Sequence, residues 1–448
     1  MHGKFDKKHF GCNWFISDLS MDIQTAVDKL FSLHQFGIKL GLENIANLLE
    51  QIGNPHKNLK TIHVAGSNGK GSTASFITSI LMEAGYKVGL YTSPHFVKYN
   101  ERIRINGIMI DDDYVAKFVT GLEDYIEKQN VTFFEITTAL AFKYFYDQKV
   151  DYAVIETGLG GRLDATNVIE PIASVITSIS LEHTEHLGDT VEKIASEKAG
   201  IIKQNSFVFT GRMPQLAENV IREKAIQCNS KYLPEANFVS LNVERVIVKL
   251  KGKKSFSMYA TSLKGEYQFY NSSLAIKVVN ECCGIEDGIV LSKGIKNVVE
   301  NTGIQGRYEV VNDHPKIIFD SAHNLEGINS FINEFSKEYQ TYKECILIFG
   351  AMRDKSIKEM LVALNPYFNR IYVTKVKIDR SASIEELQTI ASSSSIEVSE
   401  LSDPSIFIEN FEKEADKQSL VVLGSMYLLG EIKSKKLIKM LDKVIKGD

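Results

Sequence analysis

A glycine-rich turn between a strand pattern and a helix pattern is the feature of this sequence that most restricts its fold. The turn runs from Gly66 to Ser72 (GSNGKGS), follows a β-branched, apolar run at 61–65, and precedes an amphipathic helical pattern at 72–84. Glycines let backbone N–H groups surround phosphate oxygens, and the N-terminus of the following helix adds partial positive charge. This order of elements favours an α/β layered domain with an anion site at the turn.

The same turn predicts a site for a nucleoside triphosphate. Lys70 would reach the outer phosphates, and the hydroxyl of Ser72 would lie near a phosphate-bound Mg²⁺. Gly71 separates the lysine from the hydroxyl residue, which departs from the usual P-loop pattern. The alternative interpretation, a plain turn before an ordinary helix, stays open because short motifs also occur by chance.

Composition restricts the class of protein further. The chain has 448 residues, 44% of them hydrophobic, a net charge of −4, and five cysteines without CxxC spacing. The length predicts two or three domains, and the charge gives no sign of attraction to nucleic acid or to an anionic membrane. No apolar run approaches the ~20 residues that span a bilayer, and an odd number of cysteines outside any metal motif is typical of reduced thiols. We therefore expect a cytoplasmic protein with no nucleic-acid or membrane partner.

Short β-rich runs alternate with helical patterns through the first part of the chain. Strands are expected at 61–65, 88–92, 152–156, 174–178 and 207–210, and helices at 72–84, 113–128, 135–147, 190–199 and 214–228. Apolar strands separated by helices indicate parallel strands covered on both faces. Segment 232–270 has short alternating strands instead, and we expect a small antiparallel excursion there. The first twenty residues fit neither pattern and are expected to form an extension.

The α/β pattern restarts after a glycine-containing stretch at 303–306. Strands are expected at 316–319, 345–349, 370–374 and 420–423, with helices between them. This spacing predicts a second, smaller doubly wound domain. The chain is therefore expected to divide into domains at 1–303 and 304–448, with a ligand crevice between them.

Polar side chains follow several of the expected strands, at the edge where α/β sheets bind ligands. Glu156 ends one strand, His183 follows another, and Asp320 and His323 follow a strand of the second domain. A carboxylate after an apolar strand of a P-loop protein is a usual Mg²⁺ ligand. A salt-bridged or capping glutamate and surface histidines are the alternative interpretations of the same residues.

Three cations are ambiguous on the same grounds. Lys198 ends an amphipathic helix just before Gly200, which by itself favours a surface position at a helix C-terminus. Arg102 lies in a long loop and either pairs with an anionic ligand or is solvated. Arg307 follows the expected linker and is placed to bridge the two domains.

Longer motifs occur in a fixed order along the chain. They are HVAGSNGKGS, TSPH with ERIRING, GLGGRLDATN, LEHTEHLG, EKAGIIK, GEYQFYNSSLAI, FDSAHN, GAMRDKS and GSMYLLG. Over about Ala26 to Gly430, this series resembles the dihydrofolate synthase/folylpolyglutamate synthase family of the Mur ligase superfamily. The chain departs from the family pattern at Ser67 (usually Thr), at Glu182 (usually Asp), and at 304–305 (usually Trp-Pro).

The resemblance implies an α/β protein with a P-loop NTPase-like Mur-ligase central domain and a smaller Rossmann-like C-terminal domain. It implies a ligase in which ATP phosphorylates a folate carboxylate, L-glutamate attacks the acyl phosphate, and ADP and phosphate leave. The implied substrates are L-glutamate with tetrahydrofolate or dihydropteroate, and RLDATN favours activity on both. ATP, two Mg²⁺ ions, a carbamylated Lys198 and a monomeric state are implied as well.

The resemblance also assigns site residues, motif by motif. Those expected to hold the nucleotide are Gly66, Asn68, Gly69, Lys70, Gly71, Ser72, Asn271, Arg307 and Asp320; those expected to hold metal are Ser93, Glu156 and His183. Those expected to contact the pterin or glutamate are Arg102, Phe134, Asp164, Ala165, His323 and Ser425, and those expected to act in catalysis are Lys70, Lys198 and His323. The resemblance thus replaces the surface interpretation of Lys198.

Two other functions stay open beside the folate ligase. The first is another Mur-type amino-acid ligase with a different carboxylate acceptor; only ~60 residues precede the turn, too few for most additional domains. The second is a nucleotide-binding protein without ligase activity, which would leave Asp320, His323 and the GSMYLLG segment without a role.

Overall fold

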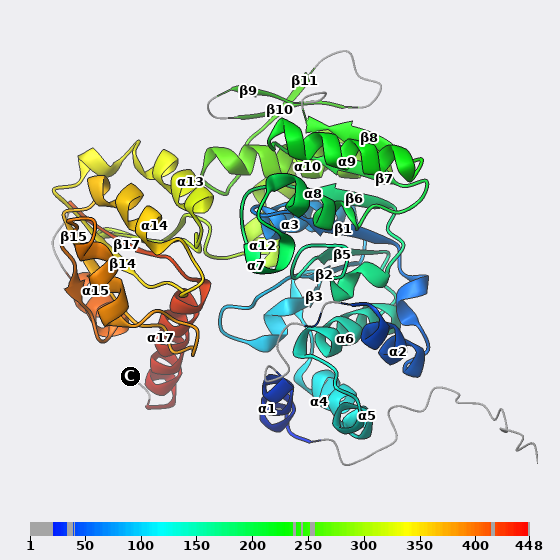
Figure 1. The fold of residues 1–448 in the computed structure, drawn as a ribbon, viewed down its shortest axis with the longest axis horizontal. Coiled ribbons are helices and arrows are strands. Elements are labelled where there is room, and N and C mark those ends of the chain that lie inside the picture. The colour runs from blue at the N-terminus through cyan, green and yellow to red at the C-terminus, as the bar shows by residue number, and fades with distance from the viewer. Residues whose placement is uncertain are drawn as a thin grey trace, which may run out of the picture.

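The computed structural model describes residues 21–33, 39, 41–235, 239–242, 245–250, 256–413 and 417–446. Two mixed α/β sheets and one small antiparallel sheet organise this part of the chain (Figure 1). The first twenty residues, expected to form an extension, lie outside the described residues. Within the described part, no helix combines the length and the apolar character that crossing a bilayer requires.

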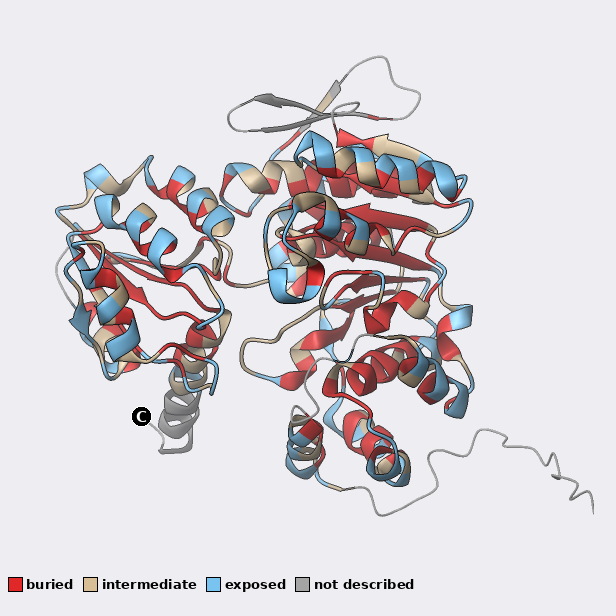
Figure 2. Cartoon of the chain, viewed as in Figure 1, coloured by how far each residue is buried: buried red, intermediate tan, exposed pale blue. Residues whose placement is uncertain are grey.

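An eight-stranded sheet forms the first unit, in the order β4-β3-β2-β5-β1-β6-β7-β8. Its strands are β1 (Thr61–Ala65), β2 (Val88–Tyr91), β3 (Ile103–Ile105), β4 (Ile108–Met109), β5 (Tyr152–Glu156), β6 (Ala173–Ile176), β7 (Phe207–Thr210) and β8 (Lys231–Pro234). β3 and β4 are antiparallel to their neighbours, and the other pairings are parallel. β1 and β5 are buried at every residue, as expected for central strands covered on both faces (Figure 2).

Helices cover both faces of this sheet. One face carries α1 (Ile23–Ser32), α2 (Glu43–Gln51), α4 (Asp112–Gly121), α5 (Glu123–Lys128) and α6 (Phe133–Asp147), whose apolar residues form one core with β2, β3 and β5. The single helix expected at 113–128 is two helices, because the chain leaves helical geometry at Leu122. Near β6 and β7 lie α7 (Thr184–Leu187), α8 (Val191–Ala199) and α9 (Gln215–Gln227).

α3 (Lys70–Glu83) follows the glycine-rich turn as expected, but it is not an amphipathic surface helix. Ten of its residues, from Ser72 to Leu81, are buried. The reason is that α10 (Glu266–Cys283), α11 (Gly288–Lys296) and α12 (Val298–Thr302) pack over its outer side. A helix buried all round has no polar face to fix its periodicity.

The expected antiparallel excursion is confirmed in its middle and wrong at its ends. β9 (Val239–Asn242), β10 (Arg245–Lys249) and β11 (Phe256–Tyr259) form the small antiparallel sheet. The start of the segment instead belongs to β8, which pairs in parallel with β7, and its last residues begin α10.

The second unit is a six-stranded sheet in the order β12-β13-β17-β14-β15-β16. Its strands are β12 (Glu309–Asp313), β13 (Lys316–Phe319), β14 (Glu344–Phe349), β15 (Arg370–Val373), β16 (Ser399–Glu400) and β17 (Gln418–Leu423), and its helices are α13 (Leu325–Phe335), α14 (Ile357–Leu364), α15 (Ile384–Ser392), α16 (Pro404–Phe411) and α17 (Met426–Lys446). All pairings are parallel except that of β12 with β13. The four strands expected here are confirmed, while β12 and β16 were not expected.

Candidate active site

The glycine-rich turn at 66–72, called the P-loop below, lies at the carboxyl end of β1 and begins α3. Gly66 and Gly69 both have positive φ (151° and 83°), and a side chain at Gly66 would meet the Thr177 hydroxyl at 1.9 Å. A side chain at Gly69 would meet Asn271 Oδ1 of α10 at 2.5 Å. The backbone of the loop is thus packed closely against Thr177, which follows β6, and against α10. The structure therefore brings Asn271, a residue expected to contact the nucleotide, next to the P-loop.

Two lysines converge on one carbonyl oxygen of this loop. Lys70 Nζ donates to the carbonyl oxygens of Gly66 (2.8 Å) and Ser67 (3.1 Å). Lys198 Nζ donates to the same Gly66 oxygen (2.9 Å) and to Glu182 Oε1 (2.8 Å). Lys198 is thus a buried residue beside the P-loop, and its interpretation as a surface cap is wrong.

Lys198 and Glu182 form an ion pair whose side chains are only 2% and 8% exposed. Burial lowers the pKa of Lys198 to about 8, and Lys70 adds to the effect while Glu182 opposes it. Burial would raise the pKa of Glu182, but Lys198 and Lys70 outweigh it and hold that pKa at about 2. The carboxylate is therefore ionised at neutral pH, and a part of the amine is not protonated.

Glu156 and Ser93 lie together at the ends of β5 and β2. The Ser93 backbone N–H donates to Glu156 Oε2 at 3.1 Å, and burial raises the pKa of Glu156 while Lys70, Arg307 and Arg102 oppose the shift. His183 immediately precedes α7, with its backbone in the left-handed region (φ 46°). Burial lowers the pKa of His183 to about 4, so the ring is neutral and has a lone pair to offer.

These three residues fit magnesium in part. Among the described residues, no group of three or more His, Cys, Asp or Glu side chains is placed to hold a metal ion. A carboxylate and hydroxyls beside a phosphate loop nevertheless match the way proteins hold Mg²⁺, with one or two carboxylates and the rest from phosphate oxygens and water. The set is thus suited to a metal that arrives with a nucleotide.

The second unit presents Asp320 and His323 after β13. Asp320 accepts hydrogen bonds from the backbone N–H groups of Tyr308 (2.7 Å) and Ala322 (2.8 Å), and its pKa is raised by burial. His323 Nδ1 lies 3.0 Å from the Ser321 carbonyl oxygen, which can only accept, so Nδ1 carries the proton and Nε2 is the acceptor. Desolvation lowers the pKa of His323 and keeps the ring neutral.

Arg307 joins the second unit to the P-loop. Its guanidinium donates to the Ser321 hydroxyl, and Nη2 lies 3.9 Å from where a side chain on Gly71 would begin. Ser425, at the end of β17, is buried, and its hydroxyl accepts from the Tyr427 backbone N–H at 3.2 Å. The structure thus brings Arg307 to the P-loop and leaves Ser425 within the second unit.

Of the residues expected to contact the pterin, Asp164 has a structural task as well. It caps the short 3₁₀ helix at Ala165–Val168 and accepts from the backbone N–H groups of Gly158 (2.9 Å) and Leu159 (2.8 Å). The Phe134 ring lies on Gly158, where an added side chain would meet it at 2.5 Å. Arg102 is buried, with Nε donating to His95 Nδ1 at 2.8 Å.

Sequence reasoning missed the residues that connect the two units at the P-loop. Asn68 donates to Glu326 Oε2 (2.6 Å) and accepts from Asn324 Nδ2 (3.1 Å). Asn324 stands one residue after His323, in the FDSAHN motif, and that adjacency was the signal available.

A second missed connection runs through the loop that carries Arg102. Phe96 lies against Gly306 and Gly430 of the second unit, so closely that a side chain on Gly430 would meet the Phe96 carbonyl oxygen at 2.1 Å. Glu101 holds this loop by accepting from three successive backbone N–H groups, which begin at Phe96. In the sequence, a single phenylalanine within a polar loop does not indicate packing against a distant part of the chain.

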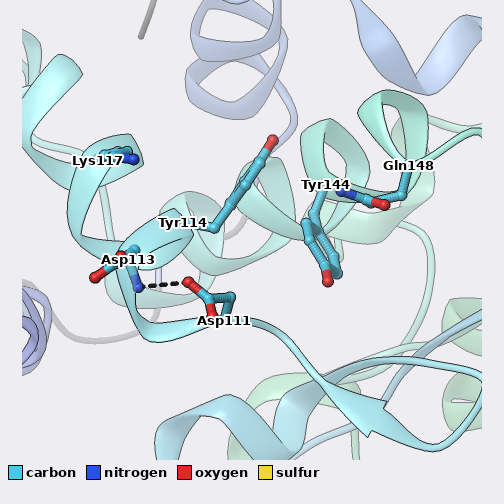
Figure 3. Close-up of a pocket in the computed structure, with 6 residues that line it drawn as sticks. All are labelled: Asp111, Asp113, Tyr114, Lys117, Tyr144 and Gln148. Atoms are coloured by element: carbon cyan, nitrogen blue, oxygen red, sulfur yellow. Dashed lines mark hydrogen bonds between the residues drawn. The ribbon is translucent and has the colours of Figure 1, made fainter.

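A pocket of about 240 Å³ lies elsewhere, on α4 and α6 (Figure 3). Tyr114 and Tyr144 form its aromatic wall, with ring centroids 4.8 Å apart, and Lys117 is among its polar residues. None of its lining residues comes from the P-loop or the second unit. We therefore assign it no part in the nucleotide site.

Comparison with known proteins identifies the family that this chain resembles. The family model for the Mur ligase middle domain matches residues 64–279, and that for the Mur ligase glutamate ligase domain matches residues 306–426. The chain is 34% identical over 423 residues to the dihydrofolate synthase/folylpolyglutamate synthase of Bacillus subtilis, covering 90% of this chain and 96% of that protein. It is 34% identical over 347 residues to the folylpolyglutamate synthase of Lacticaseibacillus casei, covering 74% and 80%.

Solved structures show the same fold. E. coli FolC in complex with DHPP and ADP superposes with a TM-score of 0.83 at 26% identity, covering 94% of this chain and 99% of that one. The folylpolyglutamate synthase of Mycobacterium tuberculosis, complexed with ADP and AMPPCP, superposes with a TM-score of 0.80 at 27% identity, covering 91% and 98%. The two-domain α/β architecture expected from the sequence is confirmed.

Proposed function

The chain belongs to the dihydrofolate synthase/folylpolyglutamate synthase family of Mur ligases, and on that premise we propose that it joins L-glutamate to a folate carboxylate with ATP. The observation that carries the proposal is that Gly71 of the P-loop and Glu156 lie beside Arg307 of the second unit. Lys198 is hydrogen-bonded to the same loop, and His323 stands one residue from the Asn324 contact to it. The proposed nucleotide site and the proposed glutamate site therefore belong to the same chain. This arrangement also supports a monomer.

The reaction proceeds in two bond-forming steps. The γ-phosphoryl group passes from ATP to the substrate carboxylate, which gives ADP and an acyl phosphate. The amino nitrogen of L-glutamate then attacks the carbonyl carbon, phosphate leaves, and an amide forms with loss of a proton. Lys70 neutralises charge on the transferred group, and Arg307 does so from the second unit. His323 accepts the amine proton at Nε2, the unprotonated nitrogen of a neutral ring.

The proposal includes a magnesium site formed by Glu156, Ser93 and His183. Bound there, Mg²⁺ would neutralise phosphate charge during transfer. Glu156 is buried at the end of β5, and a side chain added to Gly71 of the P-loop would lie 3.6 Å from its Oε2. A second ion is proposed near Lys198, where Glu182 supplies a carboxylate.

Carbamylation of Lys198 is a separate part of the proposal. The unprotonated amine adds CO₂ and loses a proton, and a pKa of about 8 leaves about a tenth of the amine unprotonated at pH 7. An ordinary lysine would leave less than about a thousandth. Incubation with ¹³C-bicarbonate should give a carbamate NMR signal that Lys198→Arg lacks, and a signal that persists in the variant would place the carbamate elsewhere.

The folate substrate is proposed to contact Phe134, Asp164 and Ala165, and the glutamate to contact Arg102, His323 and Ser425. Phe134 offers an aromatic face beside the turn that follows Glu156, which suits a flat pterin ring. The RLDATN motif supports activity on dihydropteroate as well as tetrahydrofolate. The domain division at 303/304 is part of the same proposal, supported by the change of sheet between β11 and β12. We also propose a cytoplasmic location, where ATP is available.

The test is ADP release by the purified protein with Mg²⁺-ATP. Dihydropteroate, tetrahydrofolate and no pterin are compared, each with and without L-glutamate. Release that needs both a pterin and L-glutamate supports the proposal, and release with tetrahydrofolate alone confines the activity to extending the glutamate tail. Folded, ATP-binding protein that shows no pterin-dependent release would overturn the folate assignment and favour another carboxylate acceptor.

A further inference from the structure

His63 is a polar residue in the middle of the central strand of the first unit. In β1 it pairs with Ile155 of β5 and Ser174 of β6, and its side chain is fully buried. Its Nε2 lies 2.8 Å from the hydroxyl oxygen of Thr166. Central strands covered on both faces usually carry apolar residues, so a histidine here costs desolvation energy that some contact must offset.

Thr166 carries the contact onward to Asp164. Its hydroxyl donates to Asp164 Oδ1, and its backbone N–H donates to the same oxygen at 3.0 Å. Because the single hydroxyl proton points to the carboxylate, the hydroxyl oxygen must accept from His63, which fixes the proton on Nε2. His63 Nδ1 has no hydrogen-bond partner within the described residues, so among these residues the ring makes its one hydrogen bond to Thr166.

Asp164 uses its second oxygen to close the turn at 157–164, which we call the substrate turn. Oδ2 accepts from the backbone N–H groups of Gly158 and Leu159, and the Phe134 ring lies directly on Gly158. The substrate turn also begins immediately after Glu156, the proposed metal ligand. One buried chain of hydrogen bonds therefore links the strand that ends in the P-loop to Asp164 and, through it, to Gly158, on which the Phe134 ring lies.

We propose that His63 and Thr166 are positioning residues that hold the substrate turn in the shape that binds the pterin, without touching the pterin themselves. This inference rests on the proposed function and deepens it, since it names what fixes the geometry of the folate subsite. Burial lowers the pKa of His63 to about 3, which agrees with a ring that stays neutral and keeps one proton for Thr166 throughout the working pH range. A buried chain in which every contact is a donor–acceptor match specifies one conformation of the turn.

The test compares Thr166→Val with Thr166→Ser. Valine keeps the volume and removes the hydroxyl, whereas serine keeps the hydroxyl and loses a methyl group. We measure kcat and the KM for dihydropteroate, ATP and L-glutamate, together with Tm. Thr166→Val should raise the KM for dihydropteroate roughly tenfold, as expected when a hydrogen bond to a charged group is lost, and leave the KM for ATP within about twofold. Thr166→Ser should stay close to the wild type.

If Thr166→Val does not fold, variants of His63 test the same hydrogen bond from its donor side. His63→Gln retains an N–H that can reach Thr166, and His63→Leu does not. Equal pterin KM values in the valine and serine variants would overturn the inference. So would losses in all three KM values and in kcat that follow Tm, because the chain would then be merely structural. If the wild type itself shows no pterin-dependent ADP release, the proposed function fails first, and that result is visible before any variant is made.

Discussion

At the scale of single residues, the environment of Lys198 decides what it can do. The same side chain at the same position in a helix reads as a solvated C-terminal cap in the sequence, yet it is 2% exposed and bonded to the P-loop. The difference comes from Gly161 and Gly200, which let the substrate turn and α8 approach so closely that added side chains would meet backbone atoms at 2.8 Å and 2.4 Å. Close backbone approach of this kind is a tertiary property, and no local pattern around Lys198 encodes it.

The ion pair with Glu182 predicts a pH-dependent stability. In protein kept free of CO₂ and bicarbonate, so that Lys198 is not carbamylated, Glu182→Gln should lower the free energy of unfolding at pH 7 by about 3 kcal/mol, because it leaves the Lys198 ammonium buried without its counter-charge. The folded-state pKa of Glu182, about 2, lies below its ordinary 4.5, so the stabilisation is complete above pH 4.5 and is lost as pH falls through about 2. Urea unfolding of both proteins at pH 7 and pH 3 should therefore show a smaller difference at pH 3. An equal difference at both values would mean that the charge of Glu182 is not its source.

At the scale of elements, the sequence predicts what local chemistry determines. β1, β5 and β7 have the expected bounds, because apolar runs ending at glycine or polar residues mark buried parallel strands. α3 was expected in the right place with the wrong surroundings, since its cover comes from α10 and α11, two hundred residues further along the chain. The edge strands β12 and β16 were not predicted, because no residue of β12 is fully buried and β16 has only two residues, both exposed.

The N-terminus of α13 illustrates a site contact that depends on an element's position. Asn324 caps this helix by accepting from the Gly327 backbone N–H at 2.8 Å and also donates to Asn68 of the P-loop. Glu326 contacts Asn68 without capping the helix. The start of α13 therefore has two roles that can be tested separately: Asn324 caps the helix, and Asn324 and Glu326 contact Asn68 of the P-loop.

Variants of these two residues should separate the tasks. Asn324→Ala should cost about 1 kcal/mol of stability from the lost cap and also reduce kcat, whereas Glu326→Ala should reduce kcat by a few-fold with little loss of stability. Glu326 is exposed, so its bond to Asn68 adds orientation rather than much energy. Chemical denaturation and ADP-release kinetics on both variants check this. An unchanged kcat in Glu326→Ala would show that the contact with Asn68 does not orient the P-loop.

At the scale of the whole molecule, the site exists only while the two units stay together. Each unit has its own apolar cores, and Phe96 of the first unit packs against a core of the second. Where the units meet, Lys433 Nζ of α17 pairs with Glu309 Oε2 of the same unit at 2.7 Å. The same Nζ lies 5.4 Å from the centre of the Phe96 ring of the first unit, and that ring packs on Gly306. The candidate residues of each unit could be predicted from motifs that follow strands, but their meeting could not, because it depends on small residues that allow close contact.

Gly430 offers a direct test of that contact. It lies inside α17, where alanine is ordinarily the better helix former by about 1 kcal/mol, yet an added side chain would meet the Phe96 carbonyl oxygen at 2.1 Å. Gly430→Ala should therefore force the loop that carries Arg102 away from the second unit and lower kcat roughly tenfold, without weakening α17 itself. The matched control is Gly288→Ala, at the start of α11, where an added side chain meets nothing within 4 Å. Steady-state kinetics and nucleotide titration measure kcat and ATP affinity for both variants.

ATP affinity should be unchanged in both, because neither glycine belongs to the P-loop. Full activity in Gly430→Ala would mean that the site tolerates separation of the two units at Phe96.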